Sequence, residues 1–122
     1  MQSLSKNQLI GSFYRNGNLT ANPEKRMKPV ITLEYCPKCG WLMRSAWMAQ
    51  EILTTFTEDV HGVMLHPSEI SGRFSVQIDG KKIFDRKEAG RFPEIKELKQ
   101  LIRDVVNPEK SLGHSDKLPP TP

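Results

Sequence analysis

Apolar side chains recur with regular spacing between residues 28 and 106, and this spacing predicts a series of strands and helices. Residues 28–35 are a nearly continuous run of strand formers, which favours a central strand covered on both faces. Residues 39–55 carry apolar side chains at intervals of three and four, as one side of a helix does. This row consists of Leu42, Ala46, Ala49, Leu53 and Phe56, widened by Met43, Trp47 and Ile52.

The segment that follows predicts three further strands. Residues 60–66 form a second short strand. Residues 74–78 alternate apolar and polar side chains, as a half-exposed strand does. Asp79-Gly80 is a two-residue hairpin signal, and residues 82–85 supply the returning strand.

A final helix is expected from Pro93, which suits a first helical turn, to Asn107-Pro108, which ends the pattern. The order is therefore β-α-β-β-β-α. A strand, a helix and a parallel strand make one right-handed crossover, and the hairpin then extends the sheet. We predict an α/β (α+β) fold with a four-stranded mixed sheet and two helices.

The two ends of the chain lack such periodicity. Residues 1–28 are polar and contain Asn-Gly and Asn-Pro turn signals, so we expect a flexible N-terminal extension. Residues 29–106 then form one domain. Residues 107–122 contain few apolar side chains and several prolines, which predicts a disordered C-terminal tail.

The net charge of +4 does not indicate a nucleic-acid-binding domain. Five of the 18 basic residues but only one of the 14 acidic residues lie in residues 1–28, so the rest of the chain is neutral overall. Duplex-binding domains concentrate basic side chains on a folded face instead. We expect no nucleic-acid partner.

The cysteine count and the hydropathy pattern indicate the compartment. Two cysteines allow one disulfide and not the framework of a small secreted scaffold. No apolar run approaches the ~20 residues that span a bilayer, and the first residues lack the apolar stretch of a secretory signal. We therefore expect a cytoplasmic protein that does not contact a membrane.

Both cysteines lie in one motif, Cys36-Pro37-Lys38-Cys39, where the first strand passes into the first helix. A helix N-terminus favours a thiolate, and a second thiol two residues further can resolve a mixed disulfide. We expect Cys36, nearer the solvent, to attack and Cys39, in the first helical turn, to resolve. Pro37 would stiffen the turn, and Lys38 would add positive potential.

Other interpretations of the cysteines remain open. Both could be small buried hydrophobic residues. They could bind zinc with His61 and His66, although these histidines lie on opposite faces of a strand. A zinc ion shared by two chains, each providing Cys36 and Cys39, is a further alternative.

Neighbouring aromatic residues and one glycine are supporting candidates. Trp41 lies beside the sulfurs and would either shape a partner surface or cover them, whereas Trp47 is expected in the core. Phe74 and Phe92 are also expected in the core rather than in the site. Gly72 would allow a close approach of backbone, or serve only a turn.

Residues 30–106 resemble the Rdx family, the relatives of selenoproteins W, T and H with a thioredoxin-like fold. The resemblance rests on Tyr35-Cys36-Pro37-Lys38-Cys39, on residues 71–76, on Asp79-Gly80 and on residues 90–94. Cys39 stands where the selenium-containing members have selenocysteine, which implies a reactive Cys39 and a sulfur-only, bacterial-type member. The resemblance also implies a thiol-redox role linked to glutathione or thioredoxin-type partners.

The leading hypothesis is a thiol–disulfide redox protein, a possible oxidoreductase, in which Cys36 and Cys39 alternate between dithiol and disulfide. No cofactor is expected besides this redox-active disulfide, and no metal. We expect a monomer or weak dimer whose partners are protein thiols and disulfides or glutathione. The competing hypothesis is a binding module without turnover, either a zinc-bridged dimer or a redox-gated adaptor.

Overall fold

Seven elements make up the part of the chain that the computed structural model describes, residues 28–113. They are, in order, β2 (Val30–Tyr35), α1 (Leu42–Phe56), β3 (Gly62–Pro67), β4 (Phe74–Ile78), β5 (Lys81–Asp85), α2 (Arg86–Ala89) and α3 (Ile95–Val106). The six predicted elements are all present with slightly shifted ends. α2, which has only four residues, was not predicted from the sequence.

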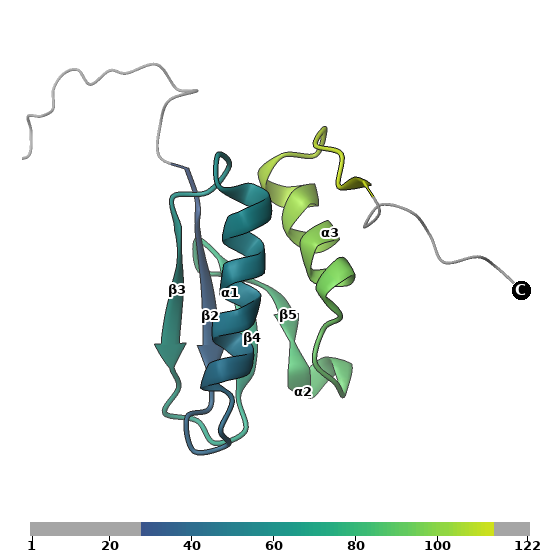
Figure 1. The fold of residues 1–122 in the computed structure, drawn as a ribbon. Helices are drawn as coiled ribbons and strands as arrows, with labels where there is room; N and C mark the ends of the chain where they lie inside the picture. Colours follow the sequence, from purple (N-terminus) through teal and green to yellow (C-terminus); the bar gives the residue numbers. More distant parts are fainter. Residues whose placement is uncertain (1–27, 114–122) are drawn as a thin grey trace, which may run out of the picture.

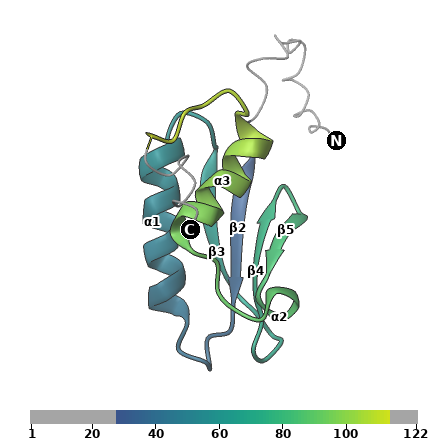
Figure 2. The ribbon, with the colours of Figure 1, turned by 90° about the vertical axis from the view of Figure 1, so that its right-hand side faces the viewer.

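The four strands form one mixed sheet in the order β3-β2-β4-β5. β2 and β3 are parallel, with α1 between them in the chain, and β4 is antiparallel to both β2 and β5. α1 and α3 lie on the same side of the sheet (Figures 1 and 2). The predicted α+β fold with a four-stranded mixed sheet is confirmed.

β2 is covered on one face only, so the expectation that both faces are covered is wrong. Ile31, Leu33 and Tyr35 are buried under the helices, whereas Thr32 and Glu34 between them are half-buried. From Ile31 onward the strand alternates apolar and polar residues, and this alternation, not the overall apolar character, decides which faces are covered.

A single core lies between the sheet and the helices, with buried side chains from β2, α1, β4 and α3. The fully buried apolar side chains other than Cys36 are Ile31, Leu33, Ile52, Phe56, Phe74, Val76, Leu98 and Ile102. The prediction that Trp47 lies in this core is wrong, because 48% of Trp47 is exposed. The row of α1 that turns inward is Ser45, Met48, Ala49, Ile52 and Phe56, and Trp47 lies beside this row.

The predicted hairpin is confirmed. Asp79 and Gly80 have φ angles of 50° and 85°, the left-handed values that a tight two-residue turn between twisted strands requires. The Asp79 carboxylate also accepts a hydrogen bond of 2.9 Å from the backbone N–H of Val30. The turn thus connects β4 to β5 and is attached to the start of the central strand.

The described fold continues past residue 106, the predicted end of the domain. Leu112 packs against the core, and the Lys110 ammonium lies 3.1 Å from an Asp59 carboxylate oxygen. Residues 107–113 of the predicted tail therefore contact the domain. Residues 1–27 of the predicted extension and residues 114–122 of the predicted tail lie outside the described residues.

Candidate functional site

The two cysteines lie in the connection between β2 and α1, at the end of the sheet where this connection meets the β3–β4 loop and α2 (Figures 1 and 2). Cys36 follows Tyr35, the last residue of β2, directly. Cys39 lies in a turn that the N–H of Gly40 closes on the carbonyl of Pro37 at 3.1 Å. Gly40 has a φ of 76°, a conformation that glycine adopts without strain, and α1 begins two residues later.

The exposure of the two sulfurs is the reverse of the sequence prediction. Cys36 is 1% exposed, whereas Cys39 is exposed. The expectation that Cys36 lies nearer the solvent is therefore wrong. So is the placement of Cys39 in the first helical turn, because α1 begins only at Leu42.

A hydrogen bond from Cys39 is the largest cause of a shift in the pKa of Cys36. This bond, followed by one from the backbone N–H of Gly72, lowers the pKa of Cys36 below that of an ordinary thiol. Donating this bond raises the pKa of Cys39, and partial desolvation raises it further. A negative charge on the pair is thus most stable on Cys36, while the proton stays on the exposed sulfur.

The loop of residues 68–73 lies beside Cys36 and supplies the N–H of Gly72. Its first residue, Ser68, is held twice: its backbone N–H donates to the Tyr35 carbonyl at 2.7 Å, and its hydroxyl donates to a Glu34 carboxylate oxygen at 2.7 Å. Gly72 has a φ of 78°, the left-handed conformation of a turn, and a Cβ atom there would meet no atom within 4 Å, so of the two predicted roles the turn is the one present. The contribution of Glu34 and Ser68 was not predicted from the sequence.

Pro37 and Lys38 line a small pocket on the Cys36 side of the site. The pocket has a volume of about 180 Å³ and is completed by Cys36, Ser68, Glu69 and Ser71. It is too small for most small-molecule ligands, which occupy about 300–1,000 Å³. Its volume and polar lining suit one side chain or a short piece of backbone beside the sulfurs.

An aromatic cluster lies beside the cysteine turn, next to Trp41. The rings of Trp41 and Phe92 pack edge to face with their centroids 4.9 Å apart, and Phe92 in turn contacts Phe74 at 5.0 Å. Phe74 is fully buried, as predicted, whereas Phe92 is only partly buried and belongs to the surroundings of the site as well as to the core. Trp41 is also partly buried.

Two arginines rest on this cluster, and the sequence analysis missed both. The guanidinium carbon of Arg86 lies 4.8 Å from the centre of the Trp41 ring and 5.0 Å from that of Phe92. The guanidinium carbon of Arg44 lies 4.4 Å from the centre of Phe92. Each such contact contributes about 0.5–2 kcal/mol, depending on how well the cation is shielded from water. The positive charge of Arg86 also acts on Cys39, whose pKa it lowers against the larger opposing causes.

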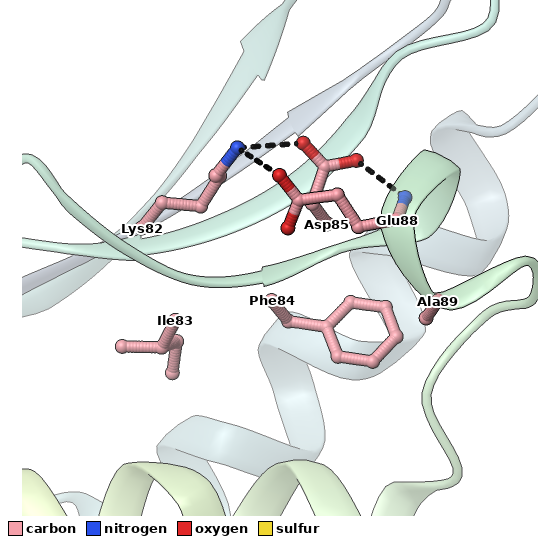
Figure 3. Close-up of a pocket in the computed structure, with 6 residues that line it drawn as sticks. All are labelled: Lys82, Ile83, Phe84, Asp85, Glu88 and Ala89. Carbon is pink, nitrogen blue, oxygen red and sulfur yellow. Dashed lines mark hydrogen bonds and ion pairs between the residues drawn. The ribbon is translucent and has the colours of Figure 1, made fainter.

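A second pocket, of about 310 Å³, lies on β5 and α2 and contains neither cysteine (Figure 3). The Lys82 ammonium there lies 2.9 Å from Asp85 and 3.2 Å from Glu88. Figure 3 shows the Ile83 and Phe84 side chains on the other side of the strand. Lys82 pairs with both carboxylates of this pocket, and no cysteine or histidine among the described residues lines it, which leaves the cysteine end as the candidate site.

Comparison with known proteins places this geometry in a family. Residues 30–104 match the family model described as the Rdx family. The chain belongs to the Rdx family. Its cysteine motif, the Gly72 loop and the start of α3 all lie within the matched region.

Two solved structures resemble this Rdx protein closely. A selenoprotein W-related protein from Vibrio cholerae is 46% identical with a TM-score of 0.63, and the match covers 66% of this chain and 99% of that chain. A protein from Bordetella parapertussis is 47% identical with a TM-score of 0.61, covering 63% of this chain and 96% of that chain. Migration and invasion enhancer 1 of Mus musculus and of Bos taurus are each 29% identical over 92 residues, which cover 74% of this chain and 76% of each relative.

Within residues 28–113, the Rdx protein has neither a candidate metal-binding cluster nor a membrane-spanning helix. No group of three or more histidine, cysteine and acidic side chains there is arranged so that it could hold a metal ion. His66 lies in β3 and His61 just before that strand, both exposed. No helix in the same residues is long and apolar enough to cross a membrane.

Proposed function

We propose that this protein exchanges electrons with thiols and disulfides through Cys36 and Cys39, which alternate between a dithiol and an internal disulfide. Membership of the Rdx family and the pairing of the two cysteines support a redox function. The observation that carries the proposal is the placement of both cysteines in one turn, with Cys39 exposed and Cys36 buried beside it, and the side chain of Cys39 lowers the pKa of Cys36. A buried structural thiol needs neither an exposed partner nor a stabilised thiolate.

The first step of the proposed reaction belongs to Cys39, because its sulfur is the exposed one. As Cys39 attacks a disulfide R–S–S–R, its proton passes along the existing hydrogen bond to the Cys36 thiolate. The new bond joins the Cys39 sulfur to one R–S group, and the other leaves as R–S⁻. Attack by Cys39 agrees with the reactivity that the family resemblance implies for this position.

The second step belongs to Cys36. It gives up its proton to solvent, attacks the Cys39 sulfur and displaces the second R–S⁻, so that the protein ends as the internal disulfide. Two electrons have passed from the two cysteines to the substrate, which is released as two thiols. A dithiol protein of the thioredoxin type, or two molecules of a thiol such as glutathione, reverses the reaction and restores the dithiol.

The proposed redox chemistry also supports a cellular location for the protein. A site that cycles between dithiol and disulfide needs a reducing thiol pool, so we propose the cytoplasm.

A zinc ion bridging two chains would need both thiolates from each chain. Because Cys36 is 1% exposed, its sulfur does not reach a metal ion held between two molecules without opening of the 68–73 loop.

Single-cysteine variants test the proposed order of attack. Cys36→Ser leaves the exposed thiol without the base that takes its proton, so the rates are compared at alkaline pH, where a single thiol ionises by itself. There we expect Cys36→Ser to form a stable mixed disulfide with oxidised glutathione, detected by mass. Cys39→Ser leaves the covered thiol and is expected to react at least about tenfold more slowly, because access limits attack. Equal rates, or a faster reaction of Cys39→Ser, would assign the attack to Cys36 and contradict this order.

A further inference from the structure

In the part of the chain that the structure describes, the two arginines on the aromatic cluster have no acidic partner, a property that Arg73 shares but Arg91 and Arg103 do not. Arg91 pairs with Glu97 at 2.8 Å, and Arg103 pairs with Asp104 at 2.8 Å. Within residues 28–113, no carboxylate forms an ion pair with Arg44 or Arg86. The positive charges of Arg44 and Arg86 are therefore available to a ligand.

The way Arg86 is held leaves its terminal nitrogens unused. Its Nε is buried and has no hydrogen-bond acceptor, so stacking on Trp41 and Phe92, rather than hydrogen bonding, fixes the guanidinium group. Arg44 lies over the ring of Phe92, so both guanidinium carbons are within 5.0 Å of the centre of one ring. A guanidinium fork fixed in this way presents parallel N–H donors that fit a carboxylate.

Arg86 is the member of this pair that acts on the exposed thiol. Trp41 is two residues after Cys39, and the charge of Arg86 acts on the Cys39 sulfur. Nearby acidic groups do not compete for this position: Asp85 accepts hydrogen bonds from Lys82 and from two N–H groups of α2, and Glu69 lines the pocket on the Cys36 side. A substrate bound at Cys39 would thus meet the unneutralised charge of Arg86, with Arg44 on the same Phe92 ring as Arg86.

We propose that Arg44 and Arg86, stacked on Trp41 and Phe92, form a binding site for a carboxylate that the disulfide substrate carries close to its sulfur. The site orients the substrate for attack by Cys39, so this inference rests on the proposed function. Two sources have the required chemistry: a small disulfide with carboxylates, such as oxidised glutathione, and a peptide disulfide flanked by an acidic residue. A neutral disulfide lacks the recognised group.

The test compares reduction rates of matched disulfides by the reduced full-length protein. One pair is oxidised glutathione and its ester with neutral carboxyl groups. The other is two disulfide-closed peptides that differ only in Asp or Asn beside a cysteine. Arg44→Gln and Arg86→Gln remove the cations, Arg86→Lys keeps the charge without the fork, and Lys96→Gln removes an exposed charge from α3 as a control.

We expect wild-type protein and Lys96→Gln to reduce the carboxylate-bearing member of a pair about tenfold faster than the neutral member. Arg44→Gln and Arg86→Gln should bring this ratio close to one, with Arg86→Lys between them, and added salt should lower the ratio only where the arginines are present. If the arginine variants lower the ratio in the glutathione pair, in the peptide pair or in both, the result supports the site and identifies which of the two substrates binds there. The ratio cancels any effect of Arg86 on the reactivity of Cys39, and exposed Arg44 gives a variant that does not depend on the packing of Arg86.

Two results would overturn the inference. If wild-type protein reduces both members of each pair at the same rate, the carboxylate site is wrong while the redox function stands. If either arginine variant keeps the wild-type ratio, that arginine does not bind the carboxylate. Wild-type protein that reduces none of the disulfides would overturn the proposed function as well.

Discussion

At the scale of single residues, the two sulfurs differ because different groups surround them. Cys36 follows a buried strand and accepts hydrogen bonds from Cys39 and from the N–H of Gly72. Cys39 lies in an exposed turn and donates a hydrogen bond to Cys36, which raises its own pKa. One sulfur is therefore suited to hold negative charge, and the other is suited to meet a substrate.

Gly72→Ala tests the source of the low pKa of Cys36. Alanine meets no atom within 4 Å at this position, but it is strained at a φ of 78° by about 1–2 kcal/mol, so the loop should shift its N–H away from the sulfur. We expect the pKa of Cys36 to rise, so that its thiolate appears only at higher pH. The pH dependence of thiol alkylation measures this change in a Cys39→Ser background and with both cysteines present.

Gly80→Ala is the matched control, because Gly80 has a φ of 85° in the hairpin, away from both sulfurs. It should lower the stability by a similar amount and leave the thiol pKa values unchanged. An unchanged pKa in Gly72→Ala, or equal pKa changes in the two glycine variants, would show that the Gly72 N–H does not stabilise the thiolate.

The sequence was sufficient to predict that the two cysteine side chains interact, because a turn over Cys-x-x-Cys brings both of them close together. It was not sufficient to predict which sulfur is exposed. Cys36 shares a pocket with residues of the 68–73 loop, which is distant in sequence, and Ser68 of that loop donates a hydrogen bond to Glu34. Nothing near Cys36 in the sequence indicates this contact.

At the scale of elements, α1 shows how a wide apolar row divides between core and surface. Helical periodicity predicts the helix, but its apolar residues cover more of the circumference than the sheet can bury. Packing against the sheet and α3 then selects Met48, Ile52 and Phe56, and leaves Trp47 and Leu53 partly exposed. The period alone does not distinguish these two groups.

Ile52→Ala and Trp47→Ala test this division. Ile52 is fully buried, so its truncation should lower the free energy of unfolding by about 2–5 kcal/mol. Trp47 is 48% exposed, and its truncation should cost less than about 1.5 kcal/mol, although it removes more atoms. Urea denaturation measures both changes, and a larger loss for Trp47→Ala would return this residue to the core.

Short elements are the least predictable from sequence. α2 has four residues, fewer than a hydrophobic period needs to become visible, and its N-cap, Asp85, also ends a strand. Yet α2 carries Arg86 to the aromatic cluster beside Cys39. The cysteine motif was therefore predictable, whereas the cations around it depend on tertiary packing.

At the scale of the whole molecule, ion pairs make the free energy of unfolding of the domain vary with pH in the acid range. The bond from Lys82 lowers the pKa of Asp85, with help from the N–H groups of Lys87 and Glu88. The bond from Arg91 lowers the pKa of Glu97 in the same way. Both carboxylates therefore bind a proton less readily in the folded than in the unfolded chain.

The sign of the pH dependence follows from these lowered values. The stabilisation is fully present above the unfolded pKa values of about 4, and it is lost as the pH falls through the folded ones. The free energy of unfolding should accordingly decrease below about pH 4 in wild-type protein and decrease less steeply in Asp85→Asn/Glu97→Gln. Urea denaturation at several pH values measures both curves, and parallel curves would contradict the assignment.

The redox titration of the cysteine pair tests the central claim most directly. The protein is equilibrated in mixtures of reduced and oxidised glutathione, its remaining thiols are alkylated, and its mass is measured. We expect the doubly alkylated dithiol to give way to an unalkylated internal disulfide of Cys36 and Cys39 as the mixtures become more oxidising. Two alkylated thiols in every mixture, or mixed disulfides that never resolve internally, would contradict it.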